Sequence, residues 1–160
     1  MRCYCCSNKS FAQCCQPFVE GMCLPQTAEQ LMRSRFTAYA ICHYDYVLNT
    51  YSEEKRNTLS VTQLKESAAD AIWFALSVVP SQSASPNEKS DSVEFTAFYF
   101  EGKSLYQLHE TSRFIVEEGA WRYHDGVLAD DCGKIKYGRN LPCLCNSGKK
   151  FKQCCATKIR

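Results

Sequence analysis

The sequence lacks a long apolar run, a secretory signal and a large net charge. No apolar stretch approaches the roughly 18 residues that a membrane-spanning helix needs, and residues 1–5 do not resemble a signal peptide. Secretion and a transmembrane segment are therefore not expected, and we predict a cytoplasmic protein. With 45% hydrophobic residues and a net charge of +2, the chain is predicted to fold. Its 160 residues suit one globular domain with small appendages.

Cysteine, in contrast, is abundant, with 12 residues. In a reducing cytosol so many thiols are more naturally metal ligands than disulfides, and a disulfide-rich secreted domain is the alternative. Near the C-terminus, Cys143 and Cys145 are followed, after eight further residues, by Cys154 and Cys155. Neither pair can easily close a disulfide on itself, but each can supply two corners of a tetrahedron around Zn²⁺. This spacing predicts a metal site.

The same spacing occurs at the N-terminus, where Cys3 and Cys5 precede Cys14 and Cys15. Four further positions are also shared, with Ser7, Lys9, Phe11 and Gln13 recurring as Ser147, Lys149, Phe151 and Gln153. Such an internal repeat is unlikely to arise from composition alone. We predict two structural zinc ions, because four thiolates leave no position for a catalytic water, although thiolates would also accept iron.

The C-terminal copy of the repeat lies in a basic segment. From Lys134 to Arg160 there are eight basic residues and no acidic one, whereas residues 1–133 carry a balance of −6. Such a segment can meet an acidic protein surface, RNA or anionic lipid, or its lysines can simply screen the thiolates. The residues that could contact a partner are Lys149, Lys150, Phe151 and Lys152. For Phe151 and Phe11, the favoured interpretation is an apolar anchor on the main domain.

Between the repeats, predicted helices precede predicted strands. Thr27 and Gln30 form a capping box before a helix over 28–40, a second helix is expected over 46–51, and Ser60 can cap a third. Strands are expected over 71–79, 93–100, 105–117 and 120–127, joined by short turns as antiparallel hairpins. Residues 80–92 are expected to form an exposed loop and residues 130–141 a linker. This order predicts an α+β protein with helices on one face of the sheet.

The two cysteine motifs resemble the SEC-C motif, the zinc-binding tail of the SecA translocation ATPase. Leu144 and Asn146 stand where that motif usually has proline and glycine, and Cys6 and Asn8 stand at glycine positions of the N-terminal copy. Asn146 and Gly148 are expected at positive φ. Cys6 is expected either to accept an awkward backbone conformation or to compete as a fifth thiolate.

The segment between the motifs resembles the bacterial YchJ family. The resemblance rests on residues 31–39, Trp73, residues 111–114 and residues 121–126. It implies a cystatin-like, nuclear-transport-factor-2-like (NTF2-like) curved antiparallel sheet over residues 27–130. Two small zinc knuckles would flank it, the N-terminal knuckle at residues 1–20 and the C-terminal knuckle at residues 138–158. The resemblance implies little about activity.

Folds of this type often enclose a pocket between the sheet and the long helix. Residues considered for that pocket are Arg33, Arg35, Trp73, Glu110, Arg113, Trp121 and Asp125. Glu110 alternates with the apolar residues of its strand, and we expect it to form a buried salt bridge with Arg33, Arg35 or Arg113. Candidate bases also include Asp125, His109 and His124, with Tyr39, Tyr99 and Tyr123 as donors. They form no recognisable motif, and no catalytic residue is assigned.

Two functions follow from these features. The first is a zinc-binding, non-enzymatic adaptor whose basic C-terminal knuckle docks on a protein or ribonucleoprotein surface, and the sequence favours it. The alternative is a small-molecule enzyme or a ligand-binding domain that uses the pocket of the central domain. Direct nucleic-acid binding has less support, because Tyr137 and Phe151 are too few aromatic residues for a stacking platform.

Overall fold

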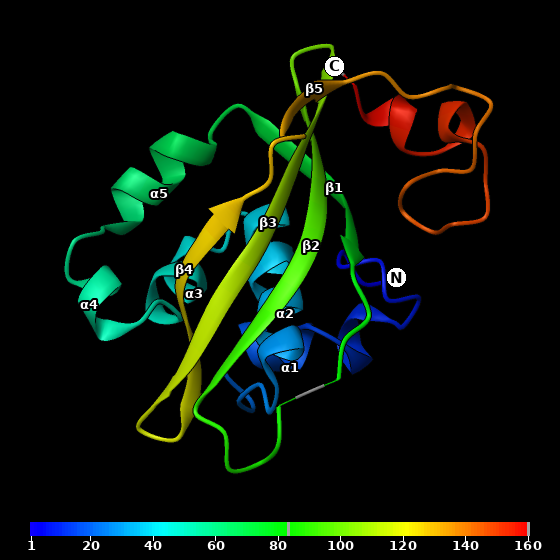
Figure 1. Ribbon diagram of the computed structural model, residues 1–160. Helices are drawn as coiled ribbons and strands as arrows, with labels where there is room; N and C mark the ends of the chain where they lie inside the picture. The colour runs from blue at the N-terminus through cyan, green and yellow to red at the C-terminus, as the bar shows by residue number, and fades with distance from the viewer. Residues whose placement is uncertain (83, 160) are drawn as a thin grey trace.

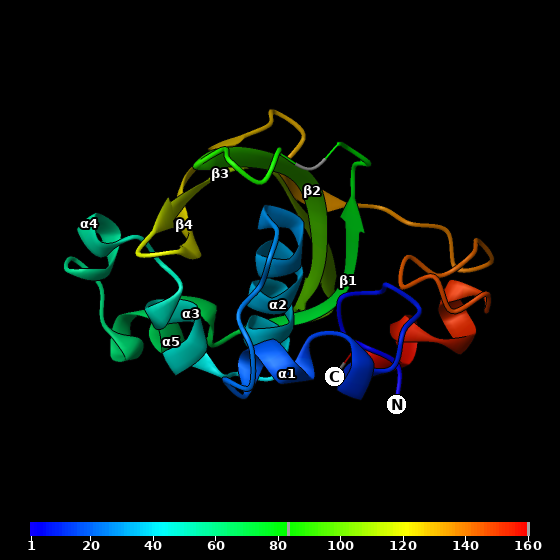
Figure 2. The same ribbon diagram turned by 90° about the horizontal axis from the view of Figure 1, so that it is seen from below.

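A curved antiparallel sheet wraps around one long helix in the computed structural model, which describes residues 1–82 and 84–159 (Figures 1 and 2). The strands follow the order β1-β2-β3-β4, and β5 pairs with the start of β3. Their bounds are β1 Ala71–Val78, β2 Ser90–Glu101, β3 Ser104–Glu117, β4 Ala120–Leu128 and β5 Gly133–Ile135. The predicted α+β fold with a curved antiparallel sheet and the predicted order of hairpins are confirmed.

Turn chemistry and bulges shape this sheet. Glu118 and Gly119 both have positive φ (50° and 78°), as the tightest hairpin turn between β3 and β4 requires. Bulges interrupt the register at Phe74 on β1 and at His124 on β4, which is skipped opposite the step from Arg113 to Phe114. Because a bulge bends a strand and increases its twist, these two positions help to curve the sheet around the helix.

The helix inside the curve is α2, Ala28–Ala40, and its start is the predicted one: the Thr27 hydroxyl accepts a hydrogen bond from the Gln30 N–H at 3.1 Å. Beyond its C-terminal end, Cys42 adopts φ 60° and the His43 N–H donates to the Ala38 carbonyl at 2.8 Å, which is a Schellman cap. The other helices are α1 Gln16–Val19, α3 Tyr44–Asn49, α4 Glu53–Arg56 and α5 Val61–Ala68. Its place in this cap leaves Cys42 exposed.

The two faces of β2 serve two different cores. Val93, Phe95 and Ala97 point to α2, whereas Phe98 and Phe100 point to the convex face. The second face is apolar because the C-terminal knuckle covers it. A strand buried on both faces needs apolar residues at successive positions, and the run at 97–98 supplies them.

Three short elements differ from the sequence-based expectation. Helices α1 and α4 were not anticipated, and β5 lies within the predicted linker 130–141. Each spans one turn or three residues, which is too short for hydrophobic periodicity to reveal. Across residues 1–82 and 84–159, none of the helices is both long and apolar enough to span a lipid bilayer.

Candidate functional site

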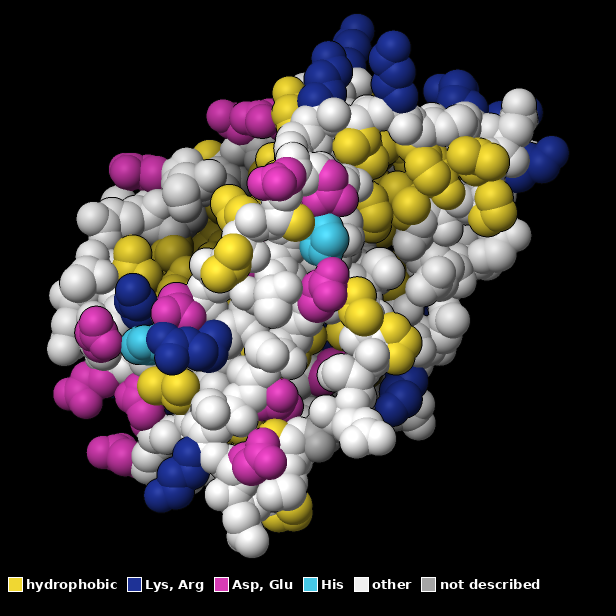
Figure 3. Space-filling view, viewed as in Figure 1, with side chains coloured by type: hydrophobic (Ala, Val, Ile, Leu, Met, Phe, Trp, Pro, Cys, Tyr) yellow, Lys and Arg dark blue, Asp and Glu magenta, His cyan; other side chains and the backbone are white. Residues whose placement is uncertain are grey.

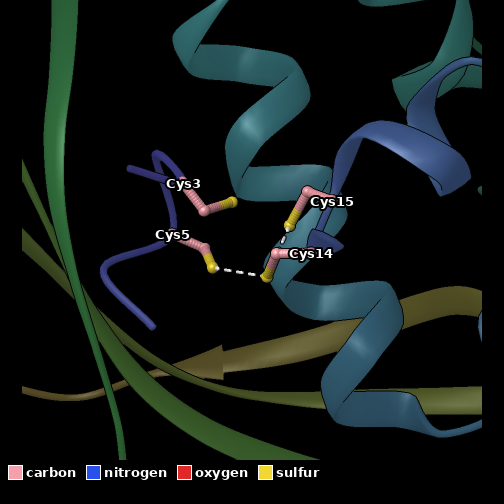
Figure 4. A group of neighbouring side chains, drawn as sticks. All are labelled: Cys3, Cys5, Cys14 and Cys15. Carbon is pink, nitrogen blue, oxygen red and sulfur yellow. Dashed lines mark hydrogen bonds between the residues drawn. The ribbon is translucent and has the colours of Figure 1, made fainter. Parts of the chain in front are cut away.

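The N-terminal knuckle brings four sulfur atoms together. The Sγ atoms of Cys3, Cys5, Cys14 and Cys15 all lie within 4.8 Å of one another, and they point toward a common centre in Figure 4. The Cys5–Cys14 and Cys14–Cys15 Sγ separations are 3.6 and 3.9 Å. A tetrahedral ion with metal–sulfur bonds of about 2.3 Å requires sulfur separations of about 3.8 Å. The group therefore fits a tetrahedral metal ion.

The C-terminal knuckle repeats the arrangement with Cys143, Cys145, Cys154 and Cys155. Its Cys145–Cys154 and Cys154–Cys155 Sγ separations are 3.6 and 4.0 Å. The Ser147 hydroxyl donates to the Cys154 sulfur at 3.2 Å. A serine in the same place, Ser7, lies 3.3 Å from the Cys14 sulfur in the N-terminal knuckle. The repeat seen in the sequence is thus a repeat of structure.

One backbone conformation builds both sites. In the C-terminal knuckle the Cys143 N–H donates to the Lys149 carbonyl at 2.8 Å, and Asn146 and Gly148 have φ of 61° and 80°, as predicted. In the N-terminal knuckle, Cys6 and Asn8 occupy the same two positions with φ of 61° and 67°. The loop turns back on itself through these left-handed residues, so the second cysteine pair returns to the first.

Each cluster contains a thiol that favours the thiolate form. Hydrogen bonds with Cys15 and Cys3 hold the pKa of Cys5 far below its ordinary value, against the opposing effect of burial. Burial also opposes ionisation of Cys145, but hydrogen bonds led by that from Ser147 lower its pKa to about 6. The thiolate is the form that binds a metal, so each cluster has one ligand, Cys5 or Cys145, whose ionisation is already favoured.

Cys6 does not join the N-terminal cluster. Its sulfur approaches the carbonyl oxygens of Tyr4 at 3.5 Å and Phe74 at 4.0 Å, away from the four clustered sulfurs. Burial raises its pKa to about 11, which disfavours the thiolate. Of the two alternatives expected for Cys6, the structure shows the unusual backbone conformation.

The two knuckles lie side by side and touch, although they come from opposite ends of the chain (Figures 1 and 2). One Arg2 nitrogen, Nη2, donates to the Cys145 carbonyl at 2.8 Å and to Asn8 Oδ1 at 2.6 Å. The Asn146 side-chain amide donates to the Cys6 carbonyl at 3.4 Å. The contact joins equivalent loops of the two repeats.

Phe151 anchors the C-terminal knuckle on the sheet. Its ring centroid lies 6.3 Å from that of Phe74 and 6.2 Å from that of Phe100, and Tyr137 meets it edge-on at 5.3 Å. Phe151 is only 5% exposed, so its place among the candidate partner-binding residues is wrong. Lys149, Lys150 and Lys152, the other three of that set, are exposed.

A cavity of about 440 Å³ lies between α2 and the concave face of the sheet. Of the candidate pocket residues, Arg35, Trp73 and Glu110 line it. The expected salt bridge of Glu110 is wrong, because Tyr123 and not an arginine reaches it: the Tyr123 hydroxyl donates to Glu110 Oε1 at 2.7 Å. Burial and the Glu110 charge raise the pKa of Tyr123, which keeps that hydroxyl protonated.

The remaining candidates lie outside the cavity. Arg33 donates to the Cys5 carbonyl at 3.0 Å and thereby ties α2 to the N-terminal knuckle. Arg113 and Asp125 form an exposed ion pair at 2.7 Å, in which the guanidinium lowers the pKa of the carboxyl. Trp121 donates from Nε1 to the Gln26 carbonyl at 3.2 Å.

Neither of the two histidines considered as bases, His109 and His124, lines the cavity. His109 lies between Glu94 and Asp131, at 2.7 and 2.8 Å, on the convex face of the sheet. The His124 ring nitrogen Nδ1 lies 2.9 Å from the Ser52 hydroxyl. Sequence reasoning missed Ser112 as a cavity residue, although its strand alternation with Glu110 and Phe114 places it on the same face.

Residues 27–126 match the family model described as the YchJ middle NTF2-like domain, and residues 139–157 match the SEC-C motif. A UPF0225 protein of Vibrio vulnificus is 38% identical over 96% of this chain and 97% of its own length. This chain belongs to the YchJ family. Another YchJ-family relative, a UPF0225 protein of Geobacter sulfurreducens, is 36% identical over 96% of both chains.

Two solved structures are similar to this YchJ-family chain. The solution structure of a SEC-C motif containing protein from Rhodopseudomonas palustris gives a TM-score of 0.73 at 29% identity, covering 81% of this chain and all of that one. The crystal structure of a SEC-C motif containing protein from Psychrobacter arcticus gives a TM-score of 0.65 at 27% identity. That match covers 96% of this chain and 89% of the other. The family resemblance noted in the sequence is confirmed.

Proposed function

We propose that this protein is a zinc-binding adaptor of the YchJ family. In this proposal each knuckle holds one structural zinc ion, and the exposed lysines of the C-terminal knuckle dock on an acidic protein or ribonucleoprotein surface in the cytoplasm. The observation that carries the first part is the pair of four-sulfur groups with tetrahedral spacing. Four protein thiolates close the coordination sphere, which suits a structural role and not a catalytic one.

Metal analysis of the purified protein tests the zinc assignment. We expect about two zinc ions per chain, because each four-cysteine group suits one ion. Cys154→Ser removes one ligand of the C-terminal group and should reduce the content to about one. Cys6→Gly is the matched control, because Cys6 lies outside the N-terminal group, and it should retain both ions. Iron in place of zinc, or a Cys154→Ser protein with unchanged metal content, would contradict the assignment.

The docking surface is supported by the charge of the C-terminal segment. The exposed basic residues include Lys149, Lys150 and Lys152, and none of the three takes part in a salt bridge within the described part of the chain. Basic side chains gather at the upper right edge of the molecule in Figure 3. Because Phe151 is fixed on the sheet, the lysines next to it are presented from an ordered loop and not from a free tail.

Charge reversal at these three lysines tests the docking. The triple variant Lys149→Glu, Lys150→Glu, Lys152→Glu should lose the partners that the wild-type protein retains from cell extract, as measured by quantitative mass spectrometry. The control reverses three exposed lysines distant in sequence from the knuckle, Lys65→Glu, Lys89→Glu and Lys103→Glu, with the same change in net charge. Retention should also fall steeply with salt. Equal retention by both triple variants would refute docking through the C-terminal knuckle.

A further inference from the structure

The cavity of the sheet has the dimensions and lining of a small-molecule site. Its volume of about 440 Å³ lies within the roughly 300–1,000 Å³ of such pockets. Helix α2 contributes Phe36 and Tyr39, and the sheet contributes rings from β1, β2 and β3, among them Trp73 and Phe95. The cavity is separate from the knuckles and plays no part in the adaptor proposal. What it could hold follows from its polar groups.

Two polar atoms in the cavity wall have no hydrogen-bond partner among the described residues. One is the hydroxyl of Ser112, a residue only 1% exposed, and the other is the indole Nε1 of Trp73. A buried donor or acceptor left unpaired costs roughly 1–3 kcal/mol. A bound molecule that pairs with these atoms would recover that cost, so their placement indicates a ligand.

A third polar group, the Glu110 carboxylate, also faces the cavity. Tyr123 donates to one of its oxygens, and no salt bridge to Glu110 occurs within residues 1–82 and 84–159. The side chain lies across Gly126 on β4, where an added Cβ would overlap Glu110 Oε1. Glycine at this position therefore makes room for the carboxyl group, which is free to accept a further hydrogen bond.

The charges of the lining select against anions. Arg35 is the basic side chain of the wall, and its Nη1 already donates to the Val47 carbonyl at 2.8 Å and to Thr50 Oγ1 at 2.6 Å. Its guanidinium lies over the rings of Tyr51 and Tyr123, 4.3 and 4.7 Å from their centroids. The wall also carries three carboxylates, Asp70, Glu101 and Glu110. An anion entering the cavity would meet an excess of negative charge.

We propose that the cavity binds a flat, largely apolar organic molecule with a hydrogen-bond donor at one end and an acceptor at the other. The donor, a hydroxyl or amine, meets Glu110, and the acceptor meets Trp73 Nε1. Trp73 pairs with Tyr99 and Glu110 pairs with Phe95 on the same strand, β2. Four residues of strand span about 13 Å along β2, and Trp73 and Glu110 lie on opposite sides of that strand, so the two polar groups stand at opposite ends of the cavity wall.

Calorimetric titration with two matched probes tests this site. One probe is a methoxynaphthalene bearing a hydroxymethyl group, and the other is the same ring bearing a carboxylate. We expect the alcohol to bind with a Kd below about 1 mM and the carboxylate at least about tenfold more weakly, a difference of roughly 1.4 kcal/mol. No binding of the alcohol at that concentration, or equal binding of the carboxylate, overturns the proposal.

Three variants locate the binding. Glu110→Gln should weaken binding of the alcohol probe several-fold, because it removes the charge that strengthens the hydrogen bond. It should also reduce the difference in affinity between the alcohol and the carboxylate probes, because the same charge repels the carboxylate. The control Glu118→Gln, in the exposed turn after β3, should leave both affinities unchanged. Ala97→Leu fills the cavity from its floor and should abolish binding in a protein shown to be folded by its circular dichroism. Alcohol binding that survives Ala97→Leu overturns the proposal.

Discussion

Arg33 and Arg35 have different partners although they are two positions apart on one helix. Their spacing on α2 correctly predicts that they face different ways, and Arg33 reaches the knuckle while Arg35 reaches the cavity. Helical spacing does not predict the partner, however, and the expected Glu110 salt bridge was wrong. Glu110 instead bonds to Tyr123, a residue on β4 whose approach depends on how the sheet curves. Such tertiary detail has no local signal in the sequence.

Arg35→Lys should destabilise the protein although it keeps the charge. Lysine has no planar group to lie over the rings of Tyr51 and Tyr123, and it would hydrogen-bond to Val47 and Thr50 less well. We expect a loss of about 1–3 kcal/mol in the free energy of unfolding, measured by urea denaturation. Arg122→Lys on β4 is the matched control and should change the value by less than about 0.5 kcal/mol. Equal effects would show that the stacking geometry is unimportant.

His109 makes stability depend on pH. Hydrogen bonds with Glu94 and then Asp131 raise its pKa in the folded protein. Because the pKa of His109 is higher in the folded than in the unfolded protein, its protonated ring adds to the free energy of unfolding. This added stability is fully present below the unfolded pKa of about 6.5 and is lost as the pH rises through the folded pKa. The wild-type protein should therefore have a higher melting temperature than His109→Gln. The difference between the two should be largest at low pH and should vanish at alkaline pH. A difference that grows with pH would contradict this assignment.

At the scale of elements, length decided what the sequence could predict. Helix α2 and the strands β1 to β4 are long enough for caps and alternation to reveal them, and Thr27 caps α2 as expected. Elements α1, α4 and β5 are only three or four residues long, and β5 also depends on a partner that is distant in sequence. β5, for example, forms only because residues 133–135 meet β3 at Leu105–Gln107. Pairing of this kind is a tertiary property.

Phe151→Ala should loosen the C-terminal knuckle from the sheet without emptying its metal site. Phe151 supplies the ring that packs on Phe74 and Phe100, whereas the four sulfurs are held by the loop around it. We expect faster hydrogen exchange over residues 139–158 and β1, and a loss of about 3–5 kcal/mol in the docking of the knuckle. Phe11→Ala is the matched control, because Phe11 is less buried, and it should have the smaller effect. Unchanged exchange over the knuckle would show that Phe151 is not the anchor.

For the whole molecule, the cysteine spacing predicted both four-sulfur groups, but not how they are built into the domain. Cys3, Cys5 and Cys15 belong to the same core as Leu31 and Phe36 of α2. The C-terminal group instead belongs to the core on the convex face of the sheet. The two sites are therefore parts of different cores, which spacing along the chain cannot show.

Removal of the metal should consequently affect the two ends differently. A strong chelator at neutral pH should loosen both knuckles while the hairpins of β2, β3 and β4 stay protected, because in the proposed structural role metal binding would supply the folding energy of the knuckles. The N-terminal loss should extend into α2, since Arg33 bonds to the Cys5 carbonyl. Hydrogen exchange with and without chelator measures both effects. Unchanged exchange at the two ends would rule out structural metal.

The hydrogen bond from Arg2 to the Cys145 carbonyl joins residues 143 positions apart. During translation the N-terminal knuckle emerges first, and Cys145 is made 143 residues after Arg2. At a translation rate of roughly 5–20 residues per second, about 7–30 seconds pass between the synthesis of Arg2 and that of Cys145. A nascent chain that stops early leaves Arg2 and the outer face of β1 uncovered. The contact between the two knuckles can therefore form only after residue 145 has been made.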